Sequence, residues 1–356
     1  MPEDMAHIPQ VSEFCEGICL RRIYPRWAKL RSLLGFLHGE PLTLPYYRDA
    51  KLRHWVAYVT REHRIRKVVV FSSAMAQYVQ GRHYDGLLRV IDFVDMDSDK
   101  WRQYGEKSGW PLSWIYRREA DALLCYELKV AHIFDHALFV SREEVAHFID
   151  QSGTRMEHVT ALQNGVDLEY FDPYRDYENP YQDHTPVLVF TGAMNYWANV
   201  DAVTWFADTV FPKVRSAHEN AAFYIVGANP SPEVMALDRQ PGIYVTGRVP
   251  DVRPYLAHAA LAVAPLRIAR GVQNKVLEAM AMARAVFATP AAAEGLSARE
   301  GKEILVTADA RQMAESIIEF LDGRGDVEMG SRAREFVERE YRWERNLEHL
   351  GSLLNG

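Results

Sequence analysis

The sequence has little cysteine, since Cys15, Cys19 and Cys125 are its three cysteines. An odd number without C-x-x-C spacing indicates neither a disulfide framework nor a thiolate zinc site, and it fits a reducing cytosol. The sequence also lacks any stretch of about 18 uncharged apolar residues, the length of a membrane span, and its start lacks the apolar core of a signal peptide. We therefore expect a cytoplasmic protein that is neither secreted nor integral to a membrane.

The sequence also has no overall excess of positive charge. The 41 basic and 48 acidic side chains leave a net charge of −7, so no global field draws the chain to nucleic acid, and we expect no nucleic-acid partner. The chain also has no G-x-G-x-x-G loop after its first strand, which argues against an NAD-dependent oxidoreductase. Its 356 residues, 48% of them hydrophobic, are enough for two domains with substantial cores.

Short apolar runs rich in β-branched residues alternate with amphipathic segments of helical length, which predicts an α/β protein with a doubly wound parallel sheet in each half. A proline-rich, acidic stretch separates the halves. We expect an N-terminal Rossmann-like domain over residues 1–170, a linker over 171–186, a C-terminal Rossmann-like domain over 187–331, and terminal helices over 332–356 that pack back toward the N-terminal domain. The expected strands are Val68–Phe71, Val90–Val94, Ala137–Val140, Val187–Phe190, Phe223–Val226, Ile243–Val245, Leu261–Ala264 and Val286–Ala288.

Positive charge gathers locally in residues 20–60, which hold eight Lys or Arg and two acidic side chains. Trp27 and several leucines are interleaved with Arg26, Lys29 and Arg31, a basic amphipathic pattern typical of helices that lie on anionic lipid headgroups. An ordinary helix that packs its leucines on a core would show the same pattern. The sequence leaves both interpretations open: peripheral membrane contact, or a helix with a solvated basic face.

Residues 264–283 carry the most informative pattern. A strand ends near Pro265, a loop with Arg267, Arg270 and Gly271 follows, and a helix is expected to begin near Val272 or Gln273. The N-terminus of a helix and nearby cations attract phosphate, and Lys275 adds a further cation. Glu278, about one turn into the helix, could accept hydrogen bonds from a ribose. Taken alone, Lys275 and Glu278 would equally suit an exposed helix pair.

The segment resembles the donor-binding motif of retaining glycosyltransferases of the GT-B fold, family 4, also called group 1. Glu278 matches the second glutamate of their E-x7-E signature, which binds the nucleotide ribose in that family. The resemblance extends over further segments in the same order: Gln163–Asp167, Val189–Met194, Ala222–Gly227, Val245–Val252, and Val286–Leu296. At finer grain, Ile91–Trp101 and Phe190–Asp201 resemble the sugar transferases that accompany exosortase and PEP-CTERM loci.

The resemblance implies two Rossmann-like domains that face a cleft, with a nucleotide-diphosphate sugar as donor substrate and neither a metal nor another cofactor. It places the donor on the C-terminal domain. The implied donor-binding residues are Gly192, Asn195, Asn199, Arg248, Val249, Arg267, Arg270, Gly271, Asn274, Lys275 and Glu278. Arg270 stands where the first glutamate of the signature is expected, and Asn195 and Asn199 stand near the place of a basic pair. The strand and Gly-rich loop that open family members are missing, so we expect an incomplete N-terminal domain.

Four aspartates, Asp92, Asp95, Asp97 and Asp99, follow a strand at the end where open α/β sheets carry functional groups. Asp95 or Asp92 is the candidate catalytic residue, and for Asp97 and Asp99 capping of the next helix or simple solvation is favoured. The sequence thus predicts a glycosyltransferase that acts on a glycan or lipid-linked acceptor in exopolysaccharide biosynthesis, at the inner face of the cytoplasmic membrane. The alternative is a non-catalytic subunit that binds a sugar nucleotide or glycan.

Overall fold

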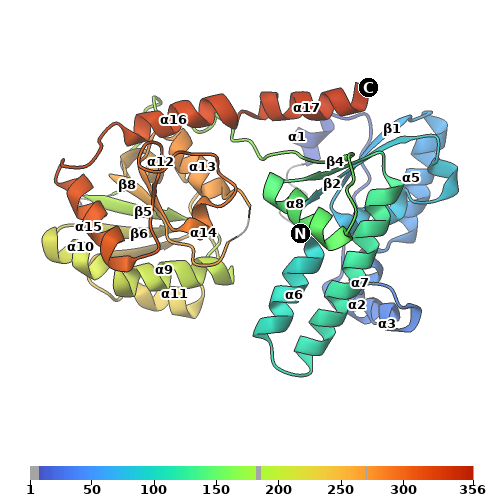
Figure 1. The fold of residues 1–356 in the computed structure, drawn as a ribbon, viewed down its shortest axis with the longest axis horizontal. Helices are drawn as coiled ribbons and strands as arrows, with labels where there is room; N and C mark the ends of the chain where they lie inside the picture. The colour runs from blue at the N-terminus through green and yellow to red at the C-terminus, as the bar shows by residue number, and fades with distance from the viewer. Residues whose placement is uncertain (1–7, 182–185, 270, 356) are drawn as a thin grey trace. The chain divides into compact units, whose positions relative to one another are not determined.

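The structure is a computed structural model, and it describes residues 8–181, 186–269 and 271–355. The chain divides into two compact units, residues 1–162 with 352–356 (unit 1) and residues 163–351 (unit 2). Each unit contains one parallel sheet flanked by helices (Figure 1). Each also has a hydrophobic core of its own, so each is described by itself.

Unit 1 has a four-stranded sheet in the order β1-β2-β3-β4, and all of its neighbouring strands are parallel. The buried side chains of β2 and β3 form its core with the inner face of α7. Its elements are α1 (Ile8–Ser12), α2 (Pro25–Ser32), α3 (Leu34–His38), α4 (Thr43–Tyr47), α5 (Ala50–Glu62), β1 (Lys67–Phe71), the 3₁₀ helices η2 (Ser73–Tyr78) and η3 (Arg82–Tyr84), β2 (Leu88–Val94), α6 (Asp97–Lys107), α7 (Leu112–Ile133), β3 (His136–Phe139), α8 (Arg142–Ser152) and β4 (Val159–Ala161).

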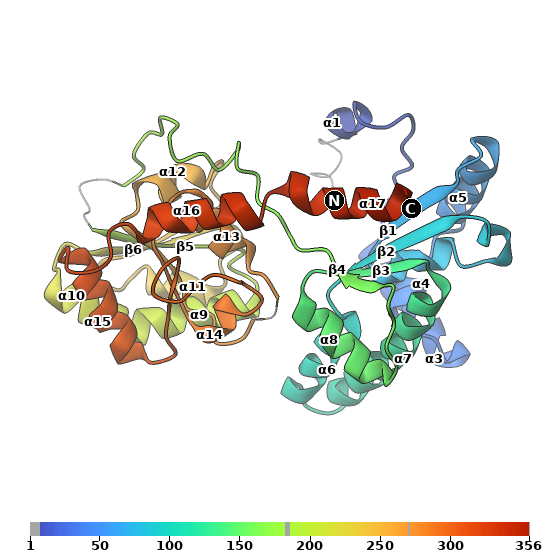
Figure 2. The ribbon, with the colours of Figure 1, turned by 45° about the horizontal axis from the view of Figure 1, so that its top comes forward.

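Unit 2 has a six-stranded parallel sheet in the order β10-β9-β8-β5-β6-β7. Helices α9, α10, α11 and α15 cover one face of this sheet, and α12, α13 and α16 cover the other (Figures 1 and 2). Its elements are β5 (Val187–Thr191), α9 (Trp197–Thr209), α10 (Phe211–Ala217), β6 (Ala222–Val226), α11 (Pro232–Leu237), β7 (Ile243–Gly247), α12 (Arg253–His258), β8 (Leu261–Ala264), α13 (Asn274–Ala281), β9 (Val286–Ala288), α14 (Pro290–Ala293), β10 (Leu305–Val306), α15 (Ala310–Leu321), α16 (Met329–Glu340) and α17 (Trp343–Asn355).

Every strand expected from an apolar run is present. Strands such as β5, β6 and β8 are buried on both faces, which leaves a continuous hydrophobic signal, whereas the edge strand β1 exposes Val69 and Phe71. Two short strands were missed. β4 spans three residues and β10 spans two, and neither is long enough to produce such a run. The signature helix α13 begins at Asn274, slightly later than expected, with Gln273 as its N-cap residue.

The division between the units lies at Leu162 and Gln163, upstream of the boundary expected after residue 170. The turn that follows packs in unit 2. Val166 is buried in the core of unit 2 and forms a β-bridge with Arg342, and a Cβ on Gly165 would lie 2.7 Å from the Trp343 ring. At the other end, residues 352–356 group with unit 1, where Lys67 donates a hydrogen bond to Asn355 at 2.9 Å.

Candidate functional site

The sheet of unit 2 has a topological switch point between β5 and β8. From β5 the chain runs outward to β6 and β7, then returns to add β8 on the other side of β5. The loops that follow β5 and β8 therefore leave the sheet in opposite directions, and open α/β sheets bind ligands at the carboxyl ends of such strands. The first loop contains Gly192 and leads to α9, and the second contains Gly271 and leads to α13.

The loop after β5 passes close to the loop after β6. Gly192 has a φ of +155°, and a Cβ on it would lie 2.8 Å from the Asn199 amide nitrogen. The neighbouring Gly227 has a φ of +154°, and a Cβ there would lie 1.7 Å from the carbonyl oxygen of Gly192. Both positions need glycine for backbone conformation and for space. The two glycines let the backbones meet at the carboxyl edge.

Lys275 and Asn199 link the first turns of α13 and α9. The Lys275 ammonium donates a hydrogen bond of 2.5 Å to Asn199 Oδ1, and Asn199 Nδ2 donates to the carbonyl of Ala193 at 2.9 Å. The ammonium also lies 4.6 Å from the centre of the Phe190 ring. Asn199 is a buried residue, so its amide orientation is fixed by these partners. The structure thus brings three predicted residues, Gly192, Asn199 and Lys275, to one place.

The charge of Lys275 is only partly compensated. Burial lowers the pKa of Lys275 to about 8, although the nearby Glu278 carboxylate acts in the opposite direction. Burial also raises the pKa of Glu278, which the Lys275 ammonium counteracts. A cation removed from water gains more from an incoming anion than an exposed cation does. The Lys275 ammonium is therefore suited to bind an anionic group at the start of α13.

Arg267 lies at the same edge but has a partner within the protein. Its Nε donates to an Asp201 carboxylate oxygen at 3.0 Å, its Nη2 donates to the other oxygen, and this pairing raises the pKa of Arg267. Asp201 belongs to α9, 66 positions earlier in the sequence, and sequence reasoning missed it as a site residue. The acidic side chain was visible, but nothing in its spacing linked it to a loop so distant.

The remaining predicted donor residues are more dispersed. Asn274 is exposed and accepts a hydrogen bond from the Asn164 side chain at 3.2 Å. Gly271 is buried with a φ of +62°. Asn195 and Arg248 are exposed, whereas Val249 packs against the core after β7. Arg270 lies outside the described residues.

The candidate catalytic aspartates lie at the carboxyl end of β2 in unit 1. Between them, Val94 has a φ of +67°, a conformation in which a β-branched residue is a genuine outlier. The Val94 amide donates to Asp92 Oδ1 at 2.9 Å, and the Asp95 amide donates to the Phe93 carbonyl at 2.9 Å. Strain of this kind costs about 1–3 kcal/mol and occurs most often at functional sites.

The two carboxylates differ in their surroundings. Burial raises the pKa of Asp92, with a smaller contribution from the Asp95 charge, while its hydrogen bond from Val94 acts against the rise. Asp95 lies 3.7 Å from the Lys100 ammonium, which also lies 3.7 Å from Asp97. Asp97 additionally accepts a hydrogen bond from the Ser73 hydroxyl at 2.9 Å. Asp95 is thus the more exposed, charge-paired carboxylate of the two candidates.

Buried glutamates hold the loop that carries these aspartates. Glu127 of α7 accepts hydrogen bonds from the Ser98 amide at 3.2 Å and from its hydroxyl at 2.5 Å. Glu144 of α8 accepts one from the Met96 amide at 3.2 Å. Burial raises the pKa of Glu127 to about 8. Neither glutamate was predicted, because a lone glutamate in a helix is usually solvated.

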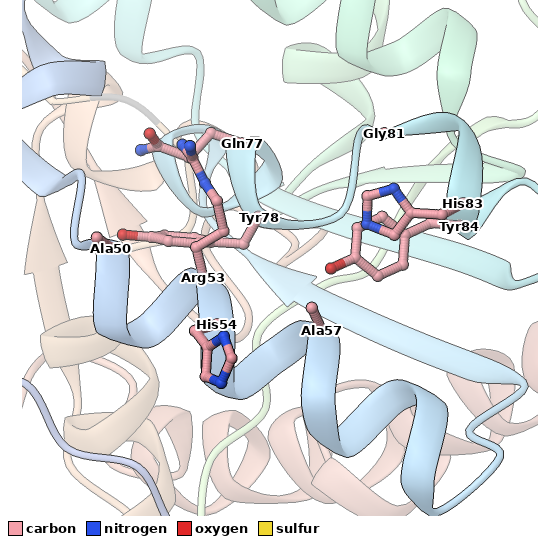
Figure 3. Close-up of a pocket in the computed structure, with 9 residues that line it drawn as sticks. All are labelled: Ala50, Arg53, His54, Ala57, Gln77, Tyr78, Gly81, His83 and Tyr84. Atoms are coloured by element: carbon pink, nitrogen blue, oxygen red, sulfur yellow. The ribbon is translucent and has the colours of Figure 1, made fainter.

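A separate pocket of about 480 Å³ lies between α5 and the 3₁₀ helices of unit 1 (Figure 3). Arg53, His54 and His83 line it together with Tyr78 and Tyr84. The described residues that line it include no acidic side chain, so the pocket suits a neutral or anionic group. The Tyr78 hydroxyl is already used, since it donates to the Tyr47 carbonyl at 2.7 Å and accepts from the Asp49 amide at 2.8 Å.

In the described part of the chain, no group of three or more His, Cys, Asp and Glu side chains is arranged to hold a metal ion. Over the same residues, no helix is both long enough and apolar enough to cross a bilayer.

Residues 185–323 match the model of a family described as Glycosyl transferases group 1. The matched segment covers most of unit 2 and includes the Gly192 loop and all of α13. A search of curated protein sequences gave no match.

Solved structures resemble the chain over most of its length. A structure of TarM is 14% identical with a TM-score of 0.61; the alignment covers 85% of this chain but only 57% of TarM. WaaG, described as a glycosyltransferase involved in lipopolysaccharide biosynthesis, is 16% identical with a TM-score of 0.62, covering 88% of this chain and 82% of WaaG. Anabaena Alr3699/HepE in complex with UDP is 13% identical with a TM-score of 0.62, covering 84% and 81%. At such identities the likeness shows the fold.

These comparisons confirm the expected fold class, an α/β protein with two Rossmann-like units as in GT-B glycosyltransferases. Unit 2 carries the group 1 glycosyltransferase domain. The family match covers residues 185–323, and outside that segment the comparisons show the fold alone.

Proposed function

We propose that the protein transfers a sugar from a nucleotide-diphosphate donor, bound by unit 2, to a glycan or lipid-linked acceptor in the cytoplasm. The observation that carries the proposal is the Lys275–Asn199 contact beside Gly192 at the switch point of the sheet. It supplies a partly buried cation beside the first backbone amides of a helix, which together suit a diphosphate. The complex of Anabaena Alr3699/HepE with UDP supports a nucleotide as the ligand of such a domain.

Each part of the donor has a group suited to it. Lys275 and the N-terminal end of α13 neutralise the diphosphate, with further charge from Arg267 and from Arg270. The Glu278 carboxylate accepts hydrogen bonds from the ribose hydroxyls. Val249 and Arg248, in the loop after β7, hold the base. Asn195, Gly271 and Asn274 line the remaining donor site. No metal or other cofactor takes part in the proposal, because these cations stabilise the departing nucleotide diphosphate.

Transfer breaks the bond between the anomeric carbon and the β-phosphate oxygen, and the nucleotide diphosphate leaves with the bonding electron pair. The acceptor hydroxyl oxygen bonds to that carbon and gives its proton to the departing phosphate. We assign Asp95, or its neighbour Asp92, to orienting the reacting sugar or the acceptor. Retention of anomeric configuration follows from the resemblance to family 4. The proposed acceptor is a growing lipid-linked glycan of exopolysaccharide assembly, in keeping with the likeness to transferases of exosortase and PEP-CTERM loci. The structural neighbour WaaG is described as acting in lipopolysaccharide biosynthesis, which also builds a bacterial glycan.

Calorimetric titration with UDP and with GDP tests the donor site. Lys275→Ala should weaken binding of the preferred nucleotide by at least about tenfold, because a charge-assisted contact with phosphate is worth about 1.5–3 kcal/mol. Lys213→Ala is the matched control, since Lys213 is an exposed lysine of α10 in the same unit. Equal affinity of Lys275→Ala and Lys213→Ala would contradict the assignment.

Turnover assays with UDP- and GDP-sugars test the catalytic assignment. Asp95→Asn should lose transfer and keep nucleotide affinity, because Asp95 belongs to unit 1 and the proposed donor site belongs to unit 2. Full activity of Asp95→Asn would rule out Asp95 as the catalytic residue, and Asp92→Asn is then the next variant to test. Nucleotide binding without turnover in the unmodified chain would instead favour a non-catalytic sugar-nucleotide-binding subunit.

A further inference from the structure

Helices α2 and α3 of unit 1 expose their apolar side chains. In α2 the only buried residue is Ala28, and in α3 it is Gly35. Trp27 is 73% exposed, Leu30 59% and Leu37 80%, and Leu33 and Leu34 are exposed as well. Leucines of an ordinary surface helix face the core, so the interpretation of this segment as a core-packed helix does not hold in unit 1.

The tip of the α6–α7 hairpin continues this apolar surface. Phe36 of α3 stacks on Trp114 of α7, with ring centroids 6.0 Å apart and an interplanar angle of 3°. Arg118 of α7 fixes the contact, since it donates to the carbonyl oxygens of Gly35 and Glu40 at 2.9 Å each. Figure 2 shows α3 beside α7 and the α6–α7 turn at the same end of unit 1.

The hairpin tip is itself apolar and exposed. Trp110 is 86% exposed, Trp114 58%, and Leu112 between them is also exposed. We call Trp27, Leu30, Leu33, Leu34, Leu37, Trp110, Leu112 and Trp114 the apolar rim. Monomeric soluble proteins rarely expose so many large side chains together unless the surface binds something.

Basic side chains accompany the apolar rim. Arg22, Arg26 and Lys29 are exposed on or next to α2, and Arg22 lies 5.2 Å from the Tyr24 ring. A pocket of about 410 Å³ at the base of α2 is lined by Arg21, Arg22 and Arg31 with Tyr24 and Trp27, and its acidic lining residue, Asp49, pairs with Arg21. This combination of tryptophan, leucine and arginine matches the chemistry of a bilayer interface, where aromatic rings sit at headgroup level.

We propose that the apolar rim docks unit 1 onto an anionic lipid bilayer, with Trp27, Leu30 and Trp110 entering the acyl boundary and Arg22, Arg26 and Lys29 binding lipid phosphates. We favour an anionic bilayer over other partners because the cations around the apolar rim complement a negatively charged surface. The proposal goes beyond the proposed glycosyl transfer and does not depend on the donor site.

Cosedimentation with vesicles tests the proposal on the full chain. We compare vesicles of phosphatidylcholine with vesicles of equal parts phosphatidylcholine and phosphatidylglycerol. The wild-type protein should bind the second kind at least about tenfold better, since each basic residue near such a surface contributes roughly a fivefold factor, and the preference should shrink in high salt. In vesicles whose acyl chains carry bromine, the tryptophan fluorescence should be quenched.

Three double variants separate the parts of the surface. Trp27→Ser with Leu30→Ser changes α2, Trp110→Ser with Leu112→Ser changes only the hairpin tip, and Arg26→Glu with Lys29→Glu reverses charge. Each should weaken vesicle binding at least about tenfold. The control, Tyr174→Ser with Val327→Ser, removes equally exposed apolar side chains of unit 2 and should bind as the wild type does. Circular dichroism and thermal unfolding serve as checks of folding.

Three results would overturn the proposal. The first is equal binding to both kinds of vesicle, and the second is rim variants that bind vesicles as well as the control does. The third is a wild-type protein that is dimeric in analytical ultracentrifugation, rim variants that are monomeric, and no vesicle binding by either. The last result would assign the apolar rim to a second copy of the chain. Because none of these measurements uses a sugar nucleotide as the readout of docking, failure here leaves the donor assignment untouched.

Discussion

Nucleotide binding should weaken as the pH rises through 8, and Lys275 is the reason. Burial lowers the pKa of Lys275 from 10.5 to about 8 in the free protein. By that value about nine-tenths of the molecules carry the ammonium at pH 7 and only about one-tenth at pH 9. A bound diphosphate replaces the lost hydration with negative charge, so the pKa of Lys275 rises again in the complex.

The magnitude follows from these two pKa values. If the pKa of Lys275 in the complex returns close to its ordinary value, affinity for UDP or GDP falls about tenfold between pH 7 and pH 9, equivalent to about 1.4 kcal/mol. The sign is fixed, because the free protein must take up a proton to bind and that uptake becomes harder at high pH. Near pH 8, binding should take up about half a proton, seen as a dependence of the calorimetric enthalpy on the buffer.

Two variants isolate the lysine from other titrations. Lys275→Arg keeps its charge over the whole range and should bind with little pH dependence. Lys275→Ala should bind weakly at every pH, and any titration of the nucleotide itself affects it as it affects the wild type. If the affinities of wild type and Lys275→Ala fall in parallel from pH 7 to pH 9, Lys275 does not contact the phosphates and the reasoning fails.

Three further predictions test the arrangement. Asn199→Asp places a carboxylate against Lys275, which should raise the pKa of Lys275, flatten the pH dependence and weaken nucleotide binding at least about tenfold in the same titrations. Gly227→Ala forces a Cβ against the Gly192 carbonyl and should lower the free energy of unfolding by about 1–3 kcal/mol in chemical denaturation. Gly86→Ala is the control, because a Cβ there meets nothing within 4 Å, and it should change the free energy of unfolding little. Equal stabilities of the two variants would disprove the close approach at Gly227. Burial raises the pKa of Glu127, so its contribution to stability is complete below about pH 4.5 and is lost as the pH rises through about 8. The melting temperature of the wild type should therefore fall between pH 5 and pH 8 relative to that of Glu127→Gln. Parallel melting curves of the two proteins would show that Glu127 does not have a raised pKa.

The secondary structure was readable from the sequence wherever burial imposes a pattern. Leu261–Ala264 and Phe223–Val226 are buried at every residue, and their unbroken apolar letters predicted strands directly. Short β10 has two half-buried residues and left no comparable signal. The pairing order β8-β5-β6 is a property of the whole sheet, and the alternation of strands and helices that predicted a doubly wound fold did not give this order.

The residues of the proposed donor site were named from the sequence, but their contacts were not. Lys275 and Gly192 were named because a cation near a helix start and a glycine after a strand each have a physical use. The pairing of Lys275 with Asn199 and of Arg267 with Asp201 joins residues 76 and 66 positions apart, which no local spacing encodes. Sequence reasoning therefore treated the two cations alike, whereas the structure gives Arg267 a carboxylate partner and Lys275 a neutral amide.

That difference between the two cations bears on how the site would work. Arg267 is charged at any physiological pH, and Asp201 offsets part of its field, so it contributes a constant, weakened attraction. Lys275 is hydrogen-bonded to an amide and lies beside a ring, Glu278 offsets its charge only partly, and burial already disfavours that charge. An incoming diphosphate thus relieves a penalty at Lys275 but must compete with Asp201 at Arg267. The change in free energy on donor binding should therefore be concentrated at Lys275, so that losing Lys275 should cost more affinity than losing Arg267, which is bound to Asp201 before the donor arrives.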